Sequence, residues 1–494
     1  MPTERQSQGC ICPKYSALVS EVERLKEQLA HLKRENDRYR RDLGRMHASM
    51  VEKPFGLSTP SAKQPVKAST PAPPDEDELR RRKGGAPAGH KGHGWKKLEP
   101  DEEVELPAPE RCPCCGGELV DPPFDSVETR DVVSAPPAKA QVRRYNVHVK
   151  FCPHCAKPVR TRIPGVLPNC RYDNSLVARA AADTYFHGIP FGTVSRRLGV
   201  NKGTLFQAFA RVAKKLEPAV ERLFGTIRSS PLAQGDESTW RTDGKNGYAW
   251  VFIAGNAVAF KCGVTRASAV AKEALGEKFQ GLYLSDRYAG YDFLAHRAYC
   301  LEHLRRDALQ IAEDDPDSAE CAAYAAQIVP VLSEIMKLRR RHGHDPGAYH
   351  AAALDAARRL RKIVSAPSQD EAVQQHKNLF LDMRLRPWQW LVGPEVPADN
   401  NRSEREIRPI AIARKVSHGS QSEQGAKERG SFMSILHSLA ACGADPGDRL
   451  ERALDALADN PKADLFDALF GGLDLDIPVL SGPILTSLPA SVTA

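Results

Sequence analysis

Three acidic residues, far apart in the chain, each lie in a distinctive local sequence. Asp236 lies in Gly-Asp-Glu-Ser-Thr-Trp, Asp286 in Leu-Ser-Asp-Arg-Tyr-Ala-Gly-Tyr, and Glu404 in Asp-Asn-Asn-Arg-Ser-Glu-Arg-Glu-Ile-Arg-Pro. Carboxylates are the preferred ligands of Mg²⁺ and Mn²⁺. Two such ions about 3.5–4 Å apart activate an attacking oxygen and stabilise a leaving oxygen at a phosphodiester. We therefore expect two catalytic Mg²⁺ or Mn²⁺ ions, held by a folded domain that brings the three acids together.

Neighbouring side chains leave alternatives open at this expected site. Glu237 follows Asp236 directly, and Glu406 lies two residues after Glu404, so either could replace its neighbour as a ligand. We favour Asp236 and Glu404 from their local sequence.

The segment Cys300-Leu-Glu-His303 follows the second acid and offers a further candidate. We expect His303 to lie near the scissile phosphate as a catalytic residue. A buried structural histidine fits the sequence equally well, and His303 with Cys300 could also form half of a metal site.

Strand and helix patterns indicate the elements that position these residues. Apolar or alternating segments at 248–255, 257–262 and 281–286 predict strands of a buried mixed sheet, with Asp236 on its first strand and Asp286 at the end of a later one. Residues 305–394 are helical and charged, and Glu404 lies in the first turn of the next helix. Trp388 and Trp390, near the end of the helical stretch, could stack on an unpaired base, but core packing is favoured.

Two Cys-x-x-Cys pairs predict a metal module at 111–168. Cys112 and Cys115 form the first pair, and Cys152 and Cys155 form the second. Four thiolates suit a closed tetrahedral Zn²⁺ site of structural type, because no position is left for a reactive water. Cys114 is a rival for Cys115, which is favoured because it alone gives the x-x spacing.

A basic stretch with a helix-turn-helix pattern follows at 171–225. Between residues 139 and 223 there are 16 Lys or Arg and 4 Asp or Glu, a balance that favours a nucleic-acid partner. The pattern predicts a short helix, a turn at Gly199-Val200 and a second helix opened by Asn201. The candidates for base edges are Lys202, Thr204 and Gln207, and those for phosphates are Arg196 and Arg197.

Other basic residues are candidates for DNA contact. Lys91 lies in a glycine-rich segment of the Pro-rich linker at 49–110, which we expect to be disordered. Four more cations follow the third acid: Arg405, Arg408, Arg414 and Lys415.

The N-terminal residues 11–48 carry a heptad seam. Asn36 falls at one a position among apolar residues, which favours an in-register two-stranded coiled coil, so we expect a homodimer or higher oligomer. A single amphipathic helix docked on its own domain is the alternative.

The last region, 443–494, is acidic. We expect a cytoplasmic protein with no membrane partner, since no apolar run of about 18 residues and no apolar signal core is present.

The order of these motifs resembles that of a large transposase of the bacterial insertion-sequence family sixty-six, a DDE enzyme. The resemblance extends to Phe55-Gly-Leu-Ser-Thr-Pro-Ser, to Gly-Gly-x-Pro-x-Gly-His-Lys-Gly-His and to Gly443-Ala-Asp-Pro446, and it maps the acidic triad onto Asp236, Asp286 and Glu404. This chain departs at Leu301-Glu302, where the family usually has Trp-Ala. It also departs at Val416-Ser-His418, where the family has an aromatic segment before Gly-Ser.

The resemblance implies a multidomain α/β protein. A ribonuclease-H-like mixed-sheet core, at 230–304 and 395–442, would carry the helical insertion 305–394 and follow the coiled coil, the zinc ribbon-like module and the helix-turn-helix. In such an enzyme a water attacks at the transposon end, and the released 3′-hydroxyl attacks target DNA. Transposon-end DNA, target DNA and small companion proteins of the same element are the implied partners. A catalytically decayed DNA-binding regulator and a nuclease without strand joining are the alternatives.

Overall fold

The computed structural model describes residues 21, 24–26, 28, 142–152, 157–160, 162–382 and 384–493. The chain divides into two compact units, Lys63–Lys139 and the remainder, and all described residues belong to the latter. Lys91, Cys112, Cys115 and Cys155 lie outside the described residues, as do Asn36 and most of the predicted coiled coil. Cys152 is described for its backbone alone, in the antiparallel hairpin of β1 (Val149–Cys152) and β2 (Lys157–Arg160).

A group of helices precedes the sheet. These are α3 (Asn174–Ala181), the π-helical η1 (Ala182–Phe186), α4 (Phe191–Leu198) and the long α5 (Lys202–Ser229). Gly199 ends α4 with φ +69°, a left-handed conformation that glycine adopts without strain. The side chain of Asn201 caps α5 by accepting the backbone N–H of Thr204 at 3.0 Å. The predicted inner face of the two helices is buried: Val194, Leu198, Leu205 and Phe209.

The central feature is a five-stranded mixed sheet in the order β5-β4-β3-β6-β7. Its strands are β3 (Leu232–Thr242), β4 (Lys245–Ala254), β5 (Ala257–Val264), β6 (Leu282–Ser285) and β7 (Arg297–Tyr299). The strands β3, β4 and β5 pair antiparallel, whereas β6 pairs parallel to β3 and to β7. The predicted mixed sheet is therefore confirmed. Between β5 and β7 lie α6 (Ser268–Leu275) and the short η2 (Ala289–Tyr291).

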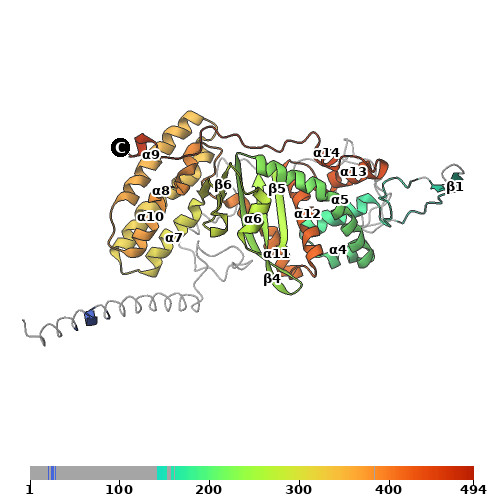
Figure 1. Cartoon of the computed structure of the whole chain (residues 1–494), viewed down its shortest axis with the longest axis horizontal. Helices are drawn as coiled ribbons and strands as arrows, with labels where there is room; N and C mark the ends of the chain where they lie inside the picture. The colour runs from blue at the N-terminus through green and yellow to red at the C-terminus, as the bar shows by residue number, and fades with distance from the viewer. Residues whose placement is uncertain are drawn as a thin grey trace, which may run out of the picture. The chain divides into compact units, whose positions relative to one another are not determined.

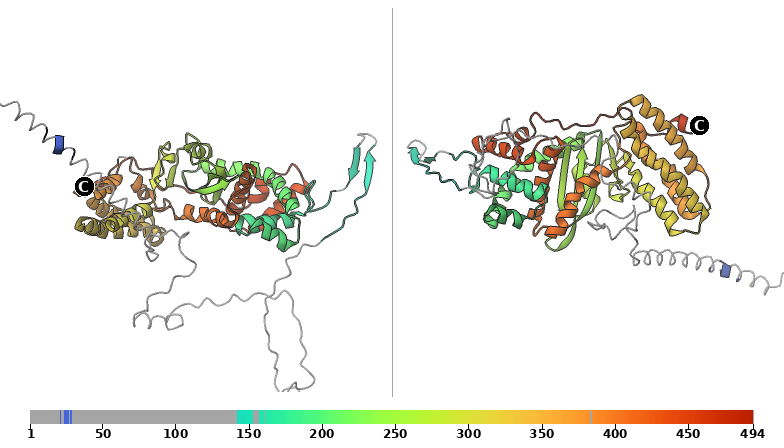
Figure 2. Two further views of the ribbon diagram at one scale, coloured as in Figure 1. Left: turned by 90° about the horizontal axis from the view of Figure 1, so that it is seen from below. Right: turned by 180° about the vertical axis from the view of Figure 1, so that it is seen from behind.

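Helices that come later in the chain cover the sheet. In the view from behind, α11 (Asn401–Ser417) crosses the sheet, where it contacts β3 and β4 (Figure 2). Helix α12 (Glu423–Ala441) lies beside β5 (Figure 1). Two of its serines accept backbone N–H groups of this edge strand, Ser434 from Phe260 at 2.8 Å and Ser438 from Val258 at 2.9 Å. These bonds satisfy an edge that would otherwise be open to another strand.

Helices between β7 and α11 form a second layer with its own hydrophobic core. They are α7 (Leu301–Asp314), α8 (Ala319–His342), α9 (Pro346–Ser365), α10 (Glu371–Leu381) and the 3-10 helix η3 (Arg386–Val392). Trp388 and Trp390 are buried in this core and donate their indole N–H groups to backbone carbonyls, so the favoured interpretation of core packing is confirmed. Helix α8 is long and apolar enough to cross a membrane, but it packs against α7 and α9.

The two ends of this helical layer meet at one place. The N–H of Leu301 at the start of α7 donates to the carbonyl of Ala398 at 2.9 Å, just before α11. The chain thus leaves the sheet and returns to it at neighbouring points.

The last part of the chain folds back on both layers. Helices α13 (Pro446–Asp459) and α14 (Leu465–Phe470) pack against α3, α5 and α12. The chain then runs to α15 (Ala490–Thr493), which contacts α9 in the helical layer (Figure 1). We call residues 471–493 the C-terminal strap.

Candidate active site

Two of the predicted acids come from neighbouring parallel strands. Asp236 lies within β3, and Asp286 directly follows β6. The register pairs Gln234 with Leu284, so that each acid lies two residues beyond the last paired positions. Parallel pairing therefore places Asp236 and Asp286 level with each other on adjacent strands.

The side chain of Asp236 is buried among other acids. Burial, together with the negative charges of Glu237, Asp286 and Glu404, raises the pKa of Asp236 to about 8. Its Oδ1 accepts the N–H of Glu237 at 2.8 Å, but no Lys or Arg of the described chain forms an ion pair with this carboxylate. At neutral pH such a group is mostly protonated unless a cation offsets the repulsion.

A buried arginine fixes the loop that carries Asp286. The guanidinium of Arg297 donates to the carbonyl oxygens of Asp286, at 2.9 Å, and of Tyr288, at 3.2 Å, and it pairs with Asp292 at 2.5 Å. Oδ1 of Asp286 in turn accepts the N–H of Tyr288 at 2.9 Å. Because Arg386 of η3 also pairs with Asp292, at 3.0 Å, the helical layer supports the same loop.

Glu404 lies in the first turn of α11, and Asn400 ties the start of that helix to the sheet. The side-chain amide of Asn400 donates to the carbonyl of Gly235 at 3.0 Å, next to Asp236. Its backbone N–H donates to the thiol sulfur of Cys300 at 3.1 Å. Among the described residues, Arg306 forms the one ion pair with Glu404, at 4.0 Å.

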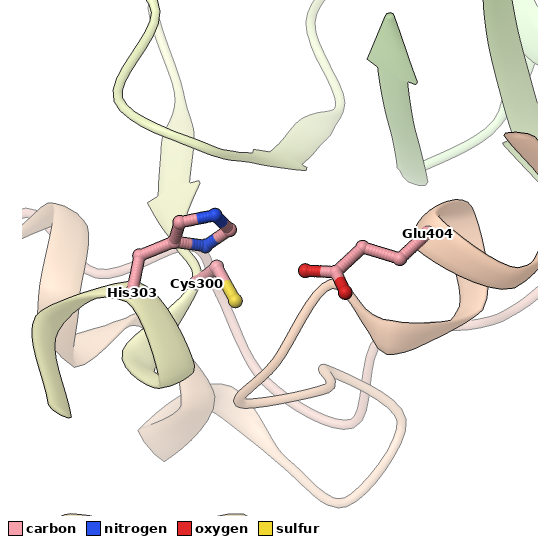
Figure 3. Close-up of side chains that lie close together, drawn as sticks. All are labelled: Cys300, His303 and Glu404. Atoms are coloured by element: carbon pink, nitrogen blue, oxygen red, sulfur yellow. The ribbon is translucent and has the colours of Figure 1, made fainter. Parts of the chain in front are cut away.

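Figure 3 shows Cys300 and His303 facing the carboxylate of Glu404. One potential ligand atom from each of these three residues lies within 4.8 Å of the other two. Cys300 is buried, which raises the pKa of its thiol to about 12, whereas His303 and Glu404 are partly exposed. Nδ1 of His303 is buried and has no hydrogen-bond partner within the described ranges. His303 is therefore beside the third acid, and the three interpretations of it remain predictions.

The two alternative acids already have protein partners. Glu237 forms an ion pair with Arg266 at 2.7 Å and accepts the hydroxyl of Tyr291 at 3.0 Å. Glu406 pairs with His437 at 2.9 Å. These contacts favour Asp236 and Glu404 as the acids that are available to a metal ion.

The candidates for DNA contact lie in two places. On α4 and α5, Arg196, Arg197, Lys202 and Gln207 are exposed, and Thr204 is half-buried. Arg197 pairs with Asp183 at 3.0 Å, and the hydroxyl of Thr204 donates to the Asn201 side chain at 3.3 Å. In the described part of the chain, no hydrogen bond or ion pair connects this group to the three acids.

The second group of candidates lies on α11, the helix that carries Glu404. Arg405, Arg408 and Lys415 are exposed. Arg414 instead donates to the carbonyl of Thr239 at 2.8 Å, so it joins α11 to β3.

Sequence reasoning did not identify the two residues that hold the acids in place. Arg297 gave no signal, since it is a single cation in a short strand. Asn400 lies beside Asn401 in the third acidic motif, and that position is the signal that could have identified it.

Comparison with known proteins gives matches over much of the chain. A family described as "Transposase IS66 family" matches residues 169–428, and one described as "zinc-finger binding domain of transposase IS66" matches residues 109–156. Two proteins of Sinorhizobium fredii (strain NBRC 101917 / NGR234) are similar. "Uncharacterized protein y4jD" is 24% identical over 72% of this chain and 77% of its own length. "Uncharacterized protein y4hP" is 20% identical over 74% of each chain.

Proposed function

Since the chain belongs to the IS66 family of transposases, we propose that it cleaves transposon ends and joins the 3′-hydroxyl to target DNA at Asp236, Asp286 and Glu404. The observation that carries the proposal is the burial of Asp236 among acids, which raises its pKa to about 8. Mutual repulsion of this kind is typical of a site that takes up cations.

The donor set fits two hard divalent ions. All three side chains offer oxygens, which Mg²⁺ and Mn²⁺ prefer, and the rival acids Glu237 and Glu406 have partners of their own. Bound there, the ions would activate the attacking oxygen and stabilise the leaving oxygen.

The residues around the acids position the reacting groups. Arg297 holds the Asp286 loop, and Asn400 holds the start of α11 against β3. Water would break the bond between phosphorus and the 3′-oxygen at the transposon end, and the freed 3′-hydroxyl would then displace a 3′-oxygen of target DNA. His303 would lie beside the scissile phosphate, and Arg405, Arg408 and Lys415 would contact neighbouring phosphates.

A structural zinc ion is the second part of the proposal. The matched zinc-finger region spans Cys112, Cys115, Cys152 and Cys155, whose paired spacing suits one closed Zn²⁺ site. Metal analysis of the purified protein should find zinc, and a variant with Cys112 and Cys115 replaced by Ser should hold about one zinc fewer per chain than the wild-type protein.

The remaining modules would deliver DNA to the site. We assign α4 and α5 to a helix-turn-helix that contacts DNA through Arg196, Arg197, Lys202, Thr204 and Gln207. The proposed coiled coil, with Asn36 in its seam, would pair two copies of the chain. A ribonuclease-H-like fold for the sheet, and companion proteins of the same element, are proposed on the family relationship.

An end-cleavage and strand-transfer assay tests the function. The substrate is DNA that carries the inverted repeats flanking the gene, with Mg²⁺ present. The wild-type protein should nick the repeat ends and form joined products, and Asp286→Asn should do neither while still binding the ends. Nicking without joining would favour a nuclease. Binding without nicking would favour a decayed regulator, and activity that survives Asp286→Asn would refute the role of the acids.

A further inference from the structure

The cluster of Cys300, His303 and Glu404 has a donor set that differs from that of the three acids. A thiolate, an imidazole and a carboxylate together suit a borderline or soft ion such as Zn²⁺, whereas the oxygens of Asp236, Asp286 and Glu404 suit a hard one. Glu404 is common to both sets.

Local structure brings these three donors together. Cys300 immediately precedes α7 and His303 lies in its first turn, so the Cys-x-x-His spacing presents both on one helix end. Glu404 lies in the first turn of α11. The backbone bond from Leu301 to Ala398 holds the two helix starts together, and so does the bond from the Asn400 N–H to the Cys300 sulfur.

The distances are close to those of a metal site. The three ligand atoms lie within 4.8 Å of one another. A tetrahedral zinc ion about 2.3 Å from sulfur and about 2.0 Å from nitrogen would hold those two atoms about 3.5 Å apart. The side chains must therefore close by up to about 1.3 Å, which rotation of the partly exposed His303 and Glu404 can supply.

We propose that Cys300, His303 and Glu404 form a Zn²⁺-type site whose occupation withdraws Glu404 from the hard-metal site and so inhibits the enzyme. The three residues supply three ligands, and water completes the tetrahedron. The ion displaces the thiol proton of Cys300, which is released to solvent. The existence of the metal site does not depend on the proposed function, whereas the proposed inhibition rests on that function.

Co²⁺ is the probe of binding, because its bond to a thiolate gives a charge-transfer absorption. Full-length protein is purified with zinc in the proposed finger, treated with a weak chelator to empty the Cys300 site, and titrated with Co²⁺ without DNA or Mg²⁺. The wild-type protein should bind Co²⁺ with a thiolate band. Replacing Cys300 with Ala should remove the band, and His303→Ala should weaken binding about 100-fold or more. The matched control is Cys262→Ala, which removes a buried cysteine of β5 and should leave the titration unchanged.

The results discriminate cleanly. A band that persists equally in Cys300→Ala and His303→Ala would arise from exchange at the proposed zinc finger, and it would overturn the site. If Cys300→Ala does not fold, His303→Ala and Glu404→Gln carry the same test, since each removes one ligand. The Co²⁺ titration does not require cleavage activity, so it tests the metal site even in a protein that cleaves no DNA.

Inhibition is measured separately. Micromolar Zn²⁺ added to the Mg²⁺-dependent cleavage reaction should inhibit the wild-type protein and the Cys262→Ala control equally. In Cys300→Ala the inhibitory concentration, taken relative to that variant's own uninhibited rate, should rise about 100-fold. An unchanged inhibitory concentration would show that zinc acts elsewhere, and it would overturn the regulatory part of the proposal.

Discussion

At the scale of single residues, Glu404 and Glu406 lie on the same helix two residues apart but have different partners. Glu404 faces Cys300 and His303 (Figure 3), whereas Glu406 pairs with His437 on α12. If Glu404 holds a catalytic ion, Glu404→Gln should lower the rate of end cleavage about 1,000-fold or more, because several kcal/mol of transition-state stabilisation are lost.

Glu406→Gln is the matched control, measured in the same cleavage assay. Because Glu406 pairs with His437, a buried residue of α12, and not with another of the acids, cleavage measured below the unfolding temperature should stay within a few-fold of the wild-type rate. A larger loss in Glu406→Gln than in Glu404→Gln would exchange the two roles.

Arg297 acts through the residue it positions. Its buried guanidinium donates to the Asp286 and Tyr288 carbonyls, and Arg297→Met would leave those acceptors without this donor. Since a displacement of about 1 Å can cost about 100-fold in rate, we expect about that loss of cleavage. Stability should also fall by about 1–3 kcal/mol, because buried carbonyl acceptors lose this donor.

The measurement for Arg297→Met is cleavage below its unfolding temperature, as a function of Mg²⁺ concentration. A displaced Asp286 should raise the Mg²⁺ concentration needed for half-maximal rate. A variant that is destabilised but has an unchanged rate and Mg²⁺ dependence would leave Arg297 with a purely structural role.

At the scale of elements, His376 of α10 ties three helices of the helical layer together. Its Nε2 lies 3.0 Å from the carbonyl of Leu304 on α7, and its Nδ1 lies 2.6 Å from the hydroxyl of Tyr324 on α8. A carbonyl can only accept, so Nε2 carries the proton and Nδ1 accepts from Tyr324. Burial lowers the pKa of His376 to about 4.

This lowered pKa predicts a loss of stability in acid. The unfolded chain binds a proton at His376 near pH 6.5, but the folded chain resists it until about pH 4, so the stabilising contribution is present at pH 7 and is lost as pH falls. The free energy of unfolding of the helical layer should fall by about 2 kcal/mol between pH 7 and pH 5 because of this residue.

Urea denaturation followed by tryptophan fluorescence checks the pH effect, because Trp388 and Trp390 lie in the same core. His376→Gln should be less stable than the wild-type protein at pH 7 but should lose less stability on acidification. Exposed His350 on α9 is the control, and His350→Gln should follow the wild-type pH dependence. Equal pH dependence in all three proteins would contradict the prediction.

The elements that sequence patterns indicate well are those whose side chains repeat with a clear period. The strand segments at 248–255 and 257–262 alternate or run apolar, and both are strands of the sheet. The turn at Gly199 was recognisable because glycine suits its positive φ. Contacts such as that of Asn400 with Gly235 were not predictable, since they join residues far apart in the chain and leave no local pattern.

At the scale of the whole chain, the region 443–494 was characterised from sequence only by its acidic charge. Its helices α13 and α14 instead bury apolar faces against α3, α5 and α12. The C-terminal strap then crosses from one hydrophobic core to another. Leu480 and Ile484 pack with residues of β3, β6 and β7. Val492 is buried in the core of the helical layer. Net charge is a property of the exposed face, so it gave no information about these buried contacts.

We therefore expect the C-terminal strap to hold the helical layer to the rest of the chain. The two valines of the strap allow a matched test. Val492 is 4% exposed and Val479 is 82% exposed. Val492→Asp would place a charge in an apolar core, so α15 should detach from α9 at a cost of about 3 kcal/mol, while Val479→Asp should cost almost nothing. Hydrogen exchange should then rise in α9 of the Val492→Asp variant but not in α12. Since Arg386 of the helical layer supports the Asp286 loop through Asp292, cleavage should also decline in the Val492→Asp variant. Equal hydrogen exchange in α9 of both variants would mean that the helical layer is held in place without the C-terminal strap.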